Sequence, residues 1–313
     1  MIGVDRVVKS MPIMGTIVTI EVLPATTGDV EPSGNAIDRA FEWFREVERV
    51  CNRFDPSSEL RQIGARAGDK TPVGEILFGA LEFALALAAD TDGAFDPTIG
   101  ARMESRGFQV DYRTGHTAPS GIADDATVSY RDVHLDRTAR AVTVDRPLLL
   151  DLGAVAKGLA IDLAARELRP FRNFGIDAGG DVFVGGLNAS REPWSVGVRH
   201  PLRDGELVDV VRVSNGAVCT SAGHERPAPA GEGHHILDGR DRAPSTAAAS
   251  ATVVAQTAMV ADAFATAAFV LGPADGVAFL ARHEVSGVIY SAAMARCATP
   301  DFGSDHAAVF PDA

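Results

Sequence analysis

One carboxylate stands alone in an apolar segment near the C-terminus. Asp262 is the only charged residue between Arg242 and Asp275, and its neighbours are apolar on nearly every helical face, which predicts a buried helix over 258–271. A buried carboxylate is unfavourable unless it is paired, hydrogen-bonded or bound to a cation. Thr266, four residues on, shares its face. Two oxygen ligands on one face suit a hard cation such as Mg²⁺; a hydrogen bond or an arginine partner for Asp262 is the alternative.

The segment LDLGAVAKG at 150–158 combines small residues with a lysine. We expect a strand that turns at Gly153 into a helix, whose first backbone amides could face a phosphate. Lys157 could add a positive charge there. The segment matches neither the Walker A pattern nor the dinucleotide-binding glycine pattern. An ordinary turn with a solvated Lys157 is therefore the alternative.

Two glycine-bounded segments could contact a ligand. In GAFDPTIG at 93–100, Phe95 could stack on a flat ring and Asp96 could accept a hydrogen bond from a ring or ribose donor. In GIDAGGD at 175–181, Gly179-Gly180 permits a tight turn or a close approach of the backbone to a ligand. Plain turns are the alternative for both segments.

A long stretch at 222–249 is rich in Gly, Pro, His and Arg. A loop of this length in a compact protein is more often functional than idle. It carries His224-Glu225-Arg226 and His234-His235, and histidine is a natural general base near neutral pH. A solvated histidine pair is the alternative. The chain has no GxSxG pattern and no nucleophilic cysteine context, so a Ser or Cys hydrolase is poorly supported.

These groups must be positioned by a mixture of strands and helices. Helices are expected at 36–50, 74–90, 155–168 and 258–271. Strands are expected at 17–23, 133–135, 141–144, 148–150, 174–177, 182–184, 194–198, 207–213, 217–220 and 287–291. The elements do not alternate regularly as βαβ units, which favours an α+β layered domain. No composition break divides the chain, so we expect one domain over 1–313.

Composition excludes several classes of protein. The 313 residues include 29 Lys plus Arg against 42 Asp plus Glu, a net charge of −13. This balance indicates no nucleic-acid partner and opposes attachment to an anionic membrane. Three cysteines without a CxxC pair argue against a disulfide framework and a zinc–thiolate site. We find no signal-peptide core at 1–20 and no membrane-spanning segment, so we expect a cytoplasmic protein.

Taken in order, these segments resemble the ApbE family of flavin transferases. The matching pieces span nearly the whole chain: Met14-Gly15-Thr16, Phe54-Asp55-Pro56 with Ser58-Glu59-Leu60, 93–100, 150–158, Asp177–Asp181, Thr220–Arg226, His234–Asp238 and 261–272. The resemblance implies an ApbE-like α+β fold related to the T-fold, a single unit with a flavin cleft between two subdomains. It also implies Mg²⁺-dependent transfer of FMN from FAD onto a Thr or Ser hydroxyl of an acceptor flavoprotein, with release of AMP.

The resemblance assigns roles residue by residue. Asp262 and Thr266 match metal ligands, with the Ala154 carbonyl as a third, and His235 matches the base that deprotonates the acceptor hydroxyl. The positions that match FAD contacts are Met14, Phe54, Ala94, Phe95, Asp96, Asp151, Lys157, Ile236 and Ala265. The chain departs from the family at Gly239, where Pro is usual, and at Phe54, where Tyr is common. A Mg²⁺-dependent FAD pyrophosphatase and a non-catalytic flavin-binding protein are the alternative functions.

Overall fold

The computed structural model describes residues 6–26, 29–64, 67–223, 229, 233–303 and 307–311. The chain forms two compact units. The first unit comprises Met1–Glu46, Lys157–Ala222 and Ala248–Ala313, and the second comprises Val47–Ala156 and Gly223–Ala247. The α+β class is confirmed, and the assignment of 1–313 to one domain stays a prediction.

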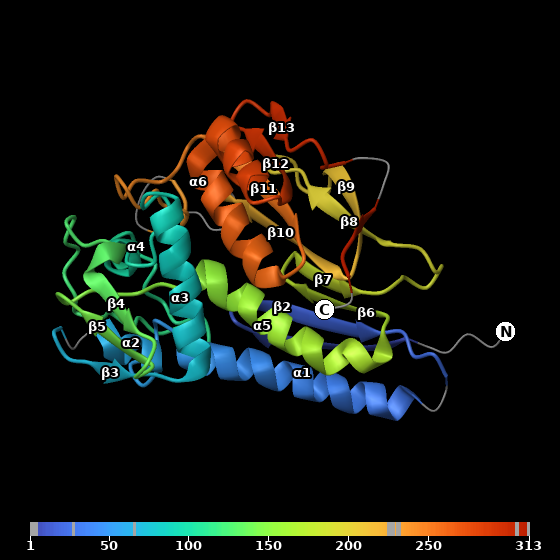
Figure 1. Ribbon diagram of the computed structural model, residues 1–313, viewed down its shortest axis with the longest axis horizontal. Helices are drawn as coiled ribbons and strands as arrows, with labels where there is room; N and C mark the ends of the chain where they lie inside the picture. The colour runs from blue at the N-terminus through green and yellow to red at the C-terminus, as the bar shows by residue number, and fades with distance from the viewer. Residues whose placement is uncertain are drawn as a thin grey trace. The chain divides into compact units, whose positions relative to one another are not determined.

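The first unit contains an antiparallel sheet of eight strands (Figure 1). In spatial order the strands are β1 (Val7–Ile13), β2 (Thr16–Val22), β6 (Phe174–Ala178), β7 (Asp181–Gly185), β10 (Gly216–Ala222), β11 (Ala248–Ala255), β12 (Ser286–Ser291) and β13 (Arg296–Ala298). A smaller sheet contains β14 (Ala308–Val309), β9 (Leu207–Ser214) and β8 (Trp194–Arg199). Valines of both sheets, among them Val184, Val211 and Val254, share one buried cluster. The branched side chains that favour strands thus also form the core between them.

The helix α6 (Ala258–Arg282) packs on β10, β11 and β12. Its regular part is 258–271, as predicted, because Gly272 has φ 81° and Pro273 follows; proline cannot donate the next helical hydrogen bond. Among the described residues, α6 is the one helix long and apolar enough to span a bilayer. Its buried residues lie on nearly every face, which is typical of a core helix in a protein interior.

The second unit is built from short elements and long connections. Its helices are α2 (Glu59–Gly64), α3 (Glu75–Asp90), α4 (Gly100–Ser105) and the 3₁₀ turn η2 (Tyr130–Asp132). Its sheet has the order β3 (Thr71–Pro72), β5 (Ala141–Val144) and β4 (Val133–Asp136). The unit boundary falls within α1 (Val30–Cys51) and α5 (Gly153–Leu168), which the 3₁₀ turn η3 (Arg169–Phe171) follows.

The strand expected at 148–150 was wrong. These three leucines are buried, but their backbone joins no sheet. Instead, the Leu148 N–H donates to the Gly64 carbonyl at 3.2 Å, and the Leu149 carbonyl accepts from the Gly100 N–H at 3.0 Å. Helix ends therefore satisfy the polar groups that a neighbouring strand would otherwise have paired.

Candidate active site

Asp262 belongs to a buried ionic cluster in the first unit. Its side chain lies in α6 and the residue is 6% exposed. One carboxylate oxygen accepts from the Gly158 N–H at 3.2 Å and from the Lys157 ammonium at 3.3 Å. Lys157 also forms an ion pair with Asp181. Asp262 is thus buried as predicted, and its charged partner is a lysine rather than an arginine.

The close approach of two helices places Asp262 next to Lys157 and Gly158. A Cβ atom added at Gly158 would lie 2.4 Å from the Ala258 carbonyl oxygen, so only glycine fits. Asp162 of α5 accepts from the Ala258 and Met259 N–H groups at 2.7 and 2.9 Å, at the start of α6. Burial raises the pKa of Asp162 to about 6. The first turn of α6 is therefore anchored on α5.

A turn that contains two glycines places Asp181 in the same cluster. Gly179 and Gly180 have φ 71° and 99° in the turn between β6 and β7, and the Asp177 carboxylate accepts from the Gly180 N–H at 2.8 Å. Gly179-Gly180 therefore forms a plain hairpin turn, which was one of the two alternatives for this segment. Asp181 is 6% exposed and accepts from the Thr220 N–H at 3.1 Å. We assigned no role to Asp181 from the sequence; its position directly after the glycine pair was the available signal.

The oxygen atoms around Asp262 fit a hard cation. Thr266 lies one turn further along α6 and its hydroxyl is 2.9 Å from that of Ser221. In the cluster of Asp181, Asp262 and Lys157, one ammonium pairs with two buried carboxylates, and buried carboxylates are stabilised by cations. Carboxylate and hydroxyl oxygens are suitable Mg²⁺ ligands. The donor set therefore fits the metal that the resemblance implies.

The third member of the predicted metal set, Ala154, belongs to the other unit. Ala154 is in the first turn of α5, within the second unit, whereas Asp262 and Thr266 belong to the first. Among the described residues, no group of three or more His, Cys, Asp or Glu side chains is arranged to hold a metal. The predicted set contains one such side chain, Asp262, so that search does not test it.

Met14 occupies a strained turn in the first unit. Met14 and Gly15 connect β1 to β2, with φ 51° and 72°. Two successive positive φ values suit the right-handed twist of a hairpin, and Asn-Gly is the usual pair there. Methionine at the first position has no local advantage. An unfavoured residue in a tight turn is typical of positions kept for a function.

Asp96 anchors the segment at 93–100 in the second unit. The residue is 7% exposed. One oxygen accepts from the Thr98 N–H and hydroxyl at 2.8 and 2.7 Å, and the other accepts from the Tyr130 N–H at 3.0 Å. Burial raises the pKa of Asp96, while its three hydrogen bonds favour the ionised form. The carboxylate is therefore fixed by its own turn. Ala94 and Phe95 beside it are also buried.

The two histidines of the long loop differ in their surroundings. The Ile236 N–H donates to His234 Nδ1 at 3.2 Å, so His234 Nε2 donates to the Ser245 carbonyl at 2.9 Å. Burial lowers the pKa of His234, which fits a neutral ring that braces the loop. The His235 ring lies edge-on to Phe108 at 6.4 Å between centroids. His235 is the better candidate for a base; His224–Arg226 lie outside the described residues.

Comparisons with known proteins agree with the resemblance. The ApbE family model matches residues 14–289. The chain belongs to the ApbE family. The crystal structure of the ApbE protein from Thermotoga maritima superposes on this chain with a TM-score of 0.84. The two sequences are 28% identical, and the match covers 96% of this chain and all of that one.

Two curated relatives carry the name FAD:protein FMN transferase. The Rhodobacter capsulatus protein is 33% identical over 259 residues, which cover 79% of this chain and 48% of the relative. The chain thus spans about half the length of that relative. The Treponema pallidum protein is 32% identical over 278 residues, which cover 81% of this chain and 75% of the relative.

The departure from the ApbE pattern at Gly239 has a local cause. The Gly239 N–H donates to the Ala94 carbonyl at 3.0 Å, a bond that proline cannot make. A Cβ atom at this position would lie 2.3 Å from the Gly93 carbonyl oxygen. In this ApbE protein, the histidine loop is therefore joined to 93–100 by a backbone hydrogen bond. The close approach at that point leaves room only for glycine.

Arg53 of the second unit is a buried residue to which the sequence assigned no role. Arg53 is 7% exposed and pairs with Asp151 at 2.8 Å between Nε and Oδ2. Its guanidinium lies over the Phe54 ring, 4.1 Å from the centroid. Asp151 and Phe54, which both match FAD contacts, thus contact the same arginine. The only available signal was its place directly before Phe54.

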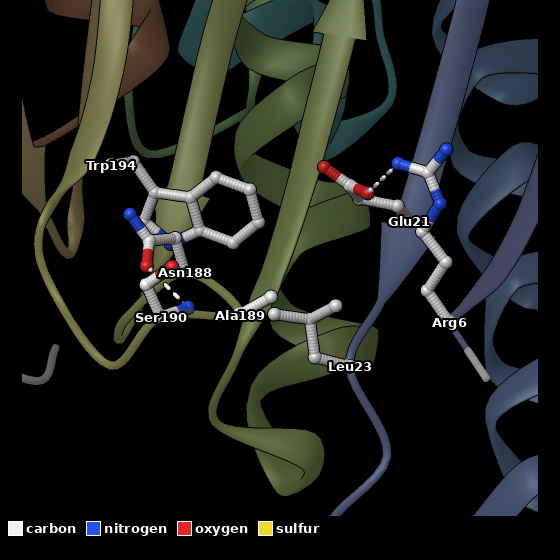
Figure 2. Close-up of a pocket in the computed structure, with 7 residues that line it drawn as sticks. All are labelled: Arg6, Glu21, Leu23, Asn188, Ala189, Ser190 and Trp194. Atoms are coloured by element: carbon white, nitrogen blue, oxygen red, sulfur yellow. Dashed lines mark hydrogen bonds and ion pairs between the residues drawn. The ribbon is translucent and has the colours of Figure 1, made fainter. Parts of the chain in front are cut away.

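A shallow pocket of about 230 Å³ in the first unit contains none of the predicted residues (Figure 2). Arg6 pairs with Glu21 on one side, and Trp194 and Asn188 lie on the other. The Trp194 indole donates to the Gly185 carbonyl at 3.2 Å. None of the residues that line this pocket belongs to the Asp262 cluster.

Proposed function

We propose that this ApbE protein transfers FMN from FAD to a Thr or Ser hydroxyl of an acceptor flavoprotein, with release of AMP. The observation that carries the proposal is the cluster in which the Lys157 ammonium pairs with the buried carboxylates of Asp181 and Asp262. Membership of the ApbE family supports it, as do the names of the two curated relatives.

In the first unit, the metal would be held by Asp262 and Thr266. Mg²⁺ bound there would offset the negative charge of the FAD pyrophosphate. Lys157 now pairs with both carboxylates. With a metal held by Asp262, the Lys157 ammonium would stay paired with Asp181 and would supply positive charge for a phosphate.

The transfer step needs a base and a positioned hydroxyl. In the proposed step, His235 removes the proton as the acceptor oxygen attacks the phosphorus of the FMN half. The new P–O bond joins FMN to the acceptor, the P–O bond to AMP breaks, and AMP leaves with the electron pair. Both ring nitrogens of His234 are engaged, with the Ser245 carbonyl and the Ile236 N–H, so it is the less suitable base.

Incubation of the purified chain with FAD, Mg²⁺ and candidate acceptor proteins tests this function. We expect AMP to form in amounts equal to acceptor-bound flavin, measured by in-gel flavin fluorescence. Equal AMP and free FMN would identify a pyrophosphatase instead. FAD binding without any AMP, with or without acceptors, would identify a flavin-binding protein and overturn the proposal.

The cytoplasmic location stays a proposal. All three cysteines, Cys51, Cys219 and Cys297, are free thiols in the structure, which is compatible with a reducing compartment. Fractionation of the native host, followed by immunodetection, tests it.

A further inference from the structure

Arg53 joins three parts of the second unit through one buried side chain. Its Nε pairs with Asp151 at 2.8 Å, and its Nη2 donates to the Phe108 carbonyl at 2.7 Å. Its flat face covers the Phe54 ring at 4.1 Å. Arginine suits this task because its planar fork can pair with a carboxylate while it stacks on an aromatic ring.

The Asp151 carboxylate is fixed from both sides. One oxygen pairs with Arg53, and the other accepts from the Gly153 N–H at 2.8 Å, at the first residue of α5. The Asp151 N–H donates to the Pro97 carbonyl at 2.7 Å. Asp151 therefore has a single orientation, set jointly by Arg53, by the start of α5 and by the segment at 93–100.

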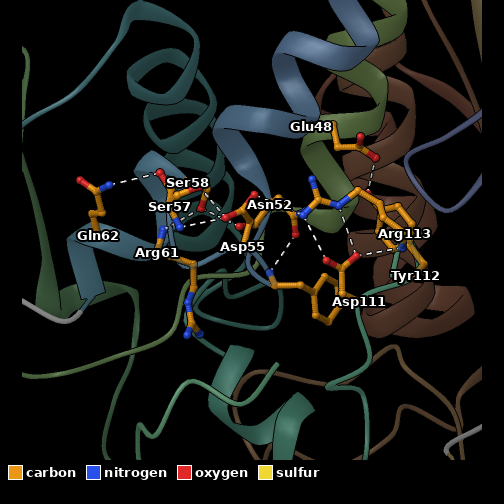
Figure 3. A network of polar contacts seen from close by, with 11 residues as sticks. Glu48, Asn52, Asp55, Ser57, Ser58, Arg61, Gln62, Asp111, Tyr112 and Arg113 are labelled. Carbon is orange, nitrogen blue, oxygen red and sulfur yellow. Dashed lines mark hydrogen bonds and ion pairs between the residues drawn. The ribbon is translucent and has the colours of Figure 1, made fainter. Parts of the chain in front are cut away.

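Phe54 is held between two side chains. Arg53 covers the ring, and Tyr112 meets it edge-on, with centroids 6.1 Å apart. The Tyr112 hydroxyl donates to Glu48 at 2.5 Å. In the same network Arg113 pairs with Asp55 and Asp111 (Figure 3). The ring orientation is therefore preset, although Phe54 lacks the hydroxyl common in the family.

The third contact of Arg53 is with Phe108, a neighbour of the candidate base His235. Phe108, whose carbonyl accepts from Arg53, places its ring edge-on to the His235 ring. Among the described residues, the buried Nη1 atom of Arg53 has no hydrogen-bond partner.

We propose that Arg53 is a positioning residue that fixes the Asp151 carboxylate and the Phe54 ring in one arrangement for FAD. The proposal rests on the proposed function, because Asp151 and Phe54 matter here as FAD contacts. Arg53 acts through these neighbours. Its removal should therefore weaken FAD binding more than it slows turnover of bound FAD.

Binding and steady-state measurements on Arg53→Met, which keeps much of the volume, test the proposal. We expect the FAD dissociation constant and KM to rise at least tenfold, with kcat within threefold. Arg53→Lys keeps the charge but loses the flat face and the fork, so it should recover only part of the affinity. Arg137→Met is the matched control: it removes an arginine that pairs with the Glu82 carboxylate in the same unit, and its FAD affinity should stay within twofold.

A double-mutant cycle separates positioning from a general loss of structure. Asp151→Asn should weaken FAD binding in the wild-type background and have little further effect beside Arg53→Met. Additive effects, or wild-type affinity in Arg53→Met, would overturn the proposal. If Arg53→Met unfolds, judged by circular dichroism, the cycle is run with Arg53→Lys. A wild-type chain that neither binds FAD nor releases AMP would refute the proposed function instead.

Discussion

The Asp262 cluster of the first unit and the turns of the second unit that carry Asp96 and His234 hold their polar groups in different ways. Asp181, Lys157 and Asp262 project from β7, α5 and α6, and the spacing of those elements sets their distances. His234 and Asp96 are instead held by side-chain bonds to nearby backbone. Regular elements can hold charges in a buried place because they need few local polar contacts. Turns can orient rings and carboxylates because their backbone groups remain available.

The comparison predicts the largest effect at Asp262. Asp262→Asn keeps the shape and an acceptor for Gly158, but it removes the charge that binds Lys157 and a cation. We expect the Mg²⁺-dependent rate of AMP release to fall at least 1,000-fold, about 4 kcal/mol. Thermal unfolding, measured in parallel, should shift by only a few degrees.

Thr266→Ser is the matched control on the same face of α6, because it retains the hydroxyl. We expect its rate to stay within tenfold of the wild type. Metal-dependent turnover in Asp262→Asn at the wild-type rate would show that the cluster serves stability alone.

The two histidines offer the next test, on the second region. His235→Gln should lower the transfer rate about 100-fold, as expected for loss of a general base, with FAD affinity within threefold. His234→Gln can still bridge to the Ser245 carbonyl, so its rate should fall less than tenfold. The transfer rates and FAD affinities of both variants decide which histidine is the base. An FAD affinity that falls as steeply as the rate in His235→Gln would make His235 a binding residue.

The sequence predicted the first region better than the second, for physical reasons. The helix at 258–271 has a strong apolar pattern with one charge, and its limits match the regular part of α6. In the second unit the helices α2 and α4 were missed and the strand expected at 148–150 was wrong. In the first unit the strands β1 and β11 were missed: β1 is a mostly half-exposed edge strand, and β11 is an alanine-rich strand beside that helix.

Residue pairing was harder to predict than the elements. The lysine partner of Asp262 lies 105 positions away along the chain. The contacts of Arg53 with Asp151 and Phe108 depend equally on tertiary structure. Hydrophobic periodicity locates elements but carries no information about which charges meet. Residue types flagged Asp262, whereas only the fold revealed Asp181 and Arg53.

A smaller effect is expected where α5 and α6 meet. Gly158→Ala would place a methyl group against backbone atoms of α6 that cannot move aside cheaply. We expect the free energy of unfolding to fall by about 1–3 kcal/mol, measured by urea denaturation. Gly79→Ala in α3 is the control, since a Cβ atom there meets nothing within 4 Å. It should stabilise the helix by about 0.5–1 kcal/mol. Equal effects of both substitutions would contradict the tight crossing.

The smallest effect concerns the turn at Met14, where folding and binding should respond in opposite directions. Met14→Asn gives the turn a residue that tolerates positive φ, so we expect a gain of about 0.5–1 kcal/mol in the free energy of unfolding. The same change removes the side chain that matches an FAD contact, so FAD affinity should fall about threefold to tenfold. Met294→Asn relieves a similar φ of 62° in another turn of the same unit and should leave FAD affinity unchanged. Should Met14→Asn gain stability and keep its affinity, the methionine has no part in binding and its strained turn has no functional explanation.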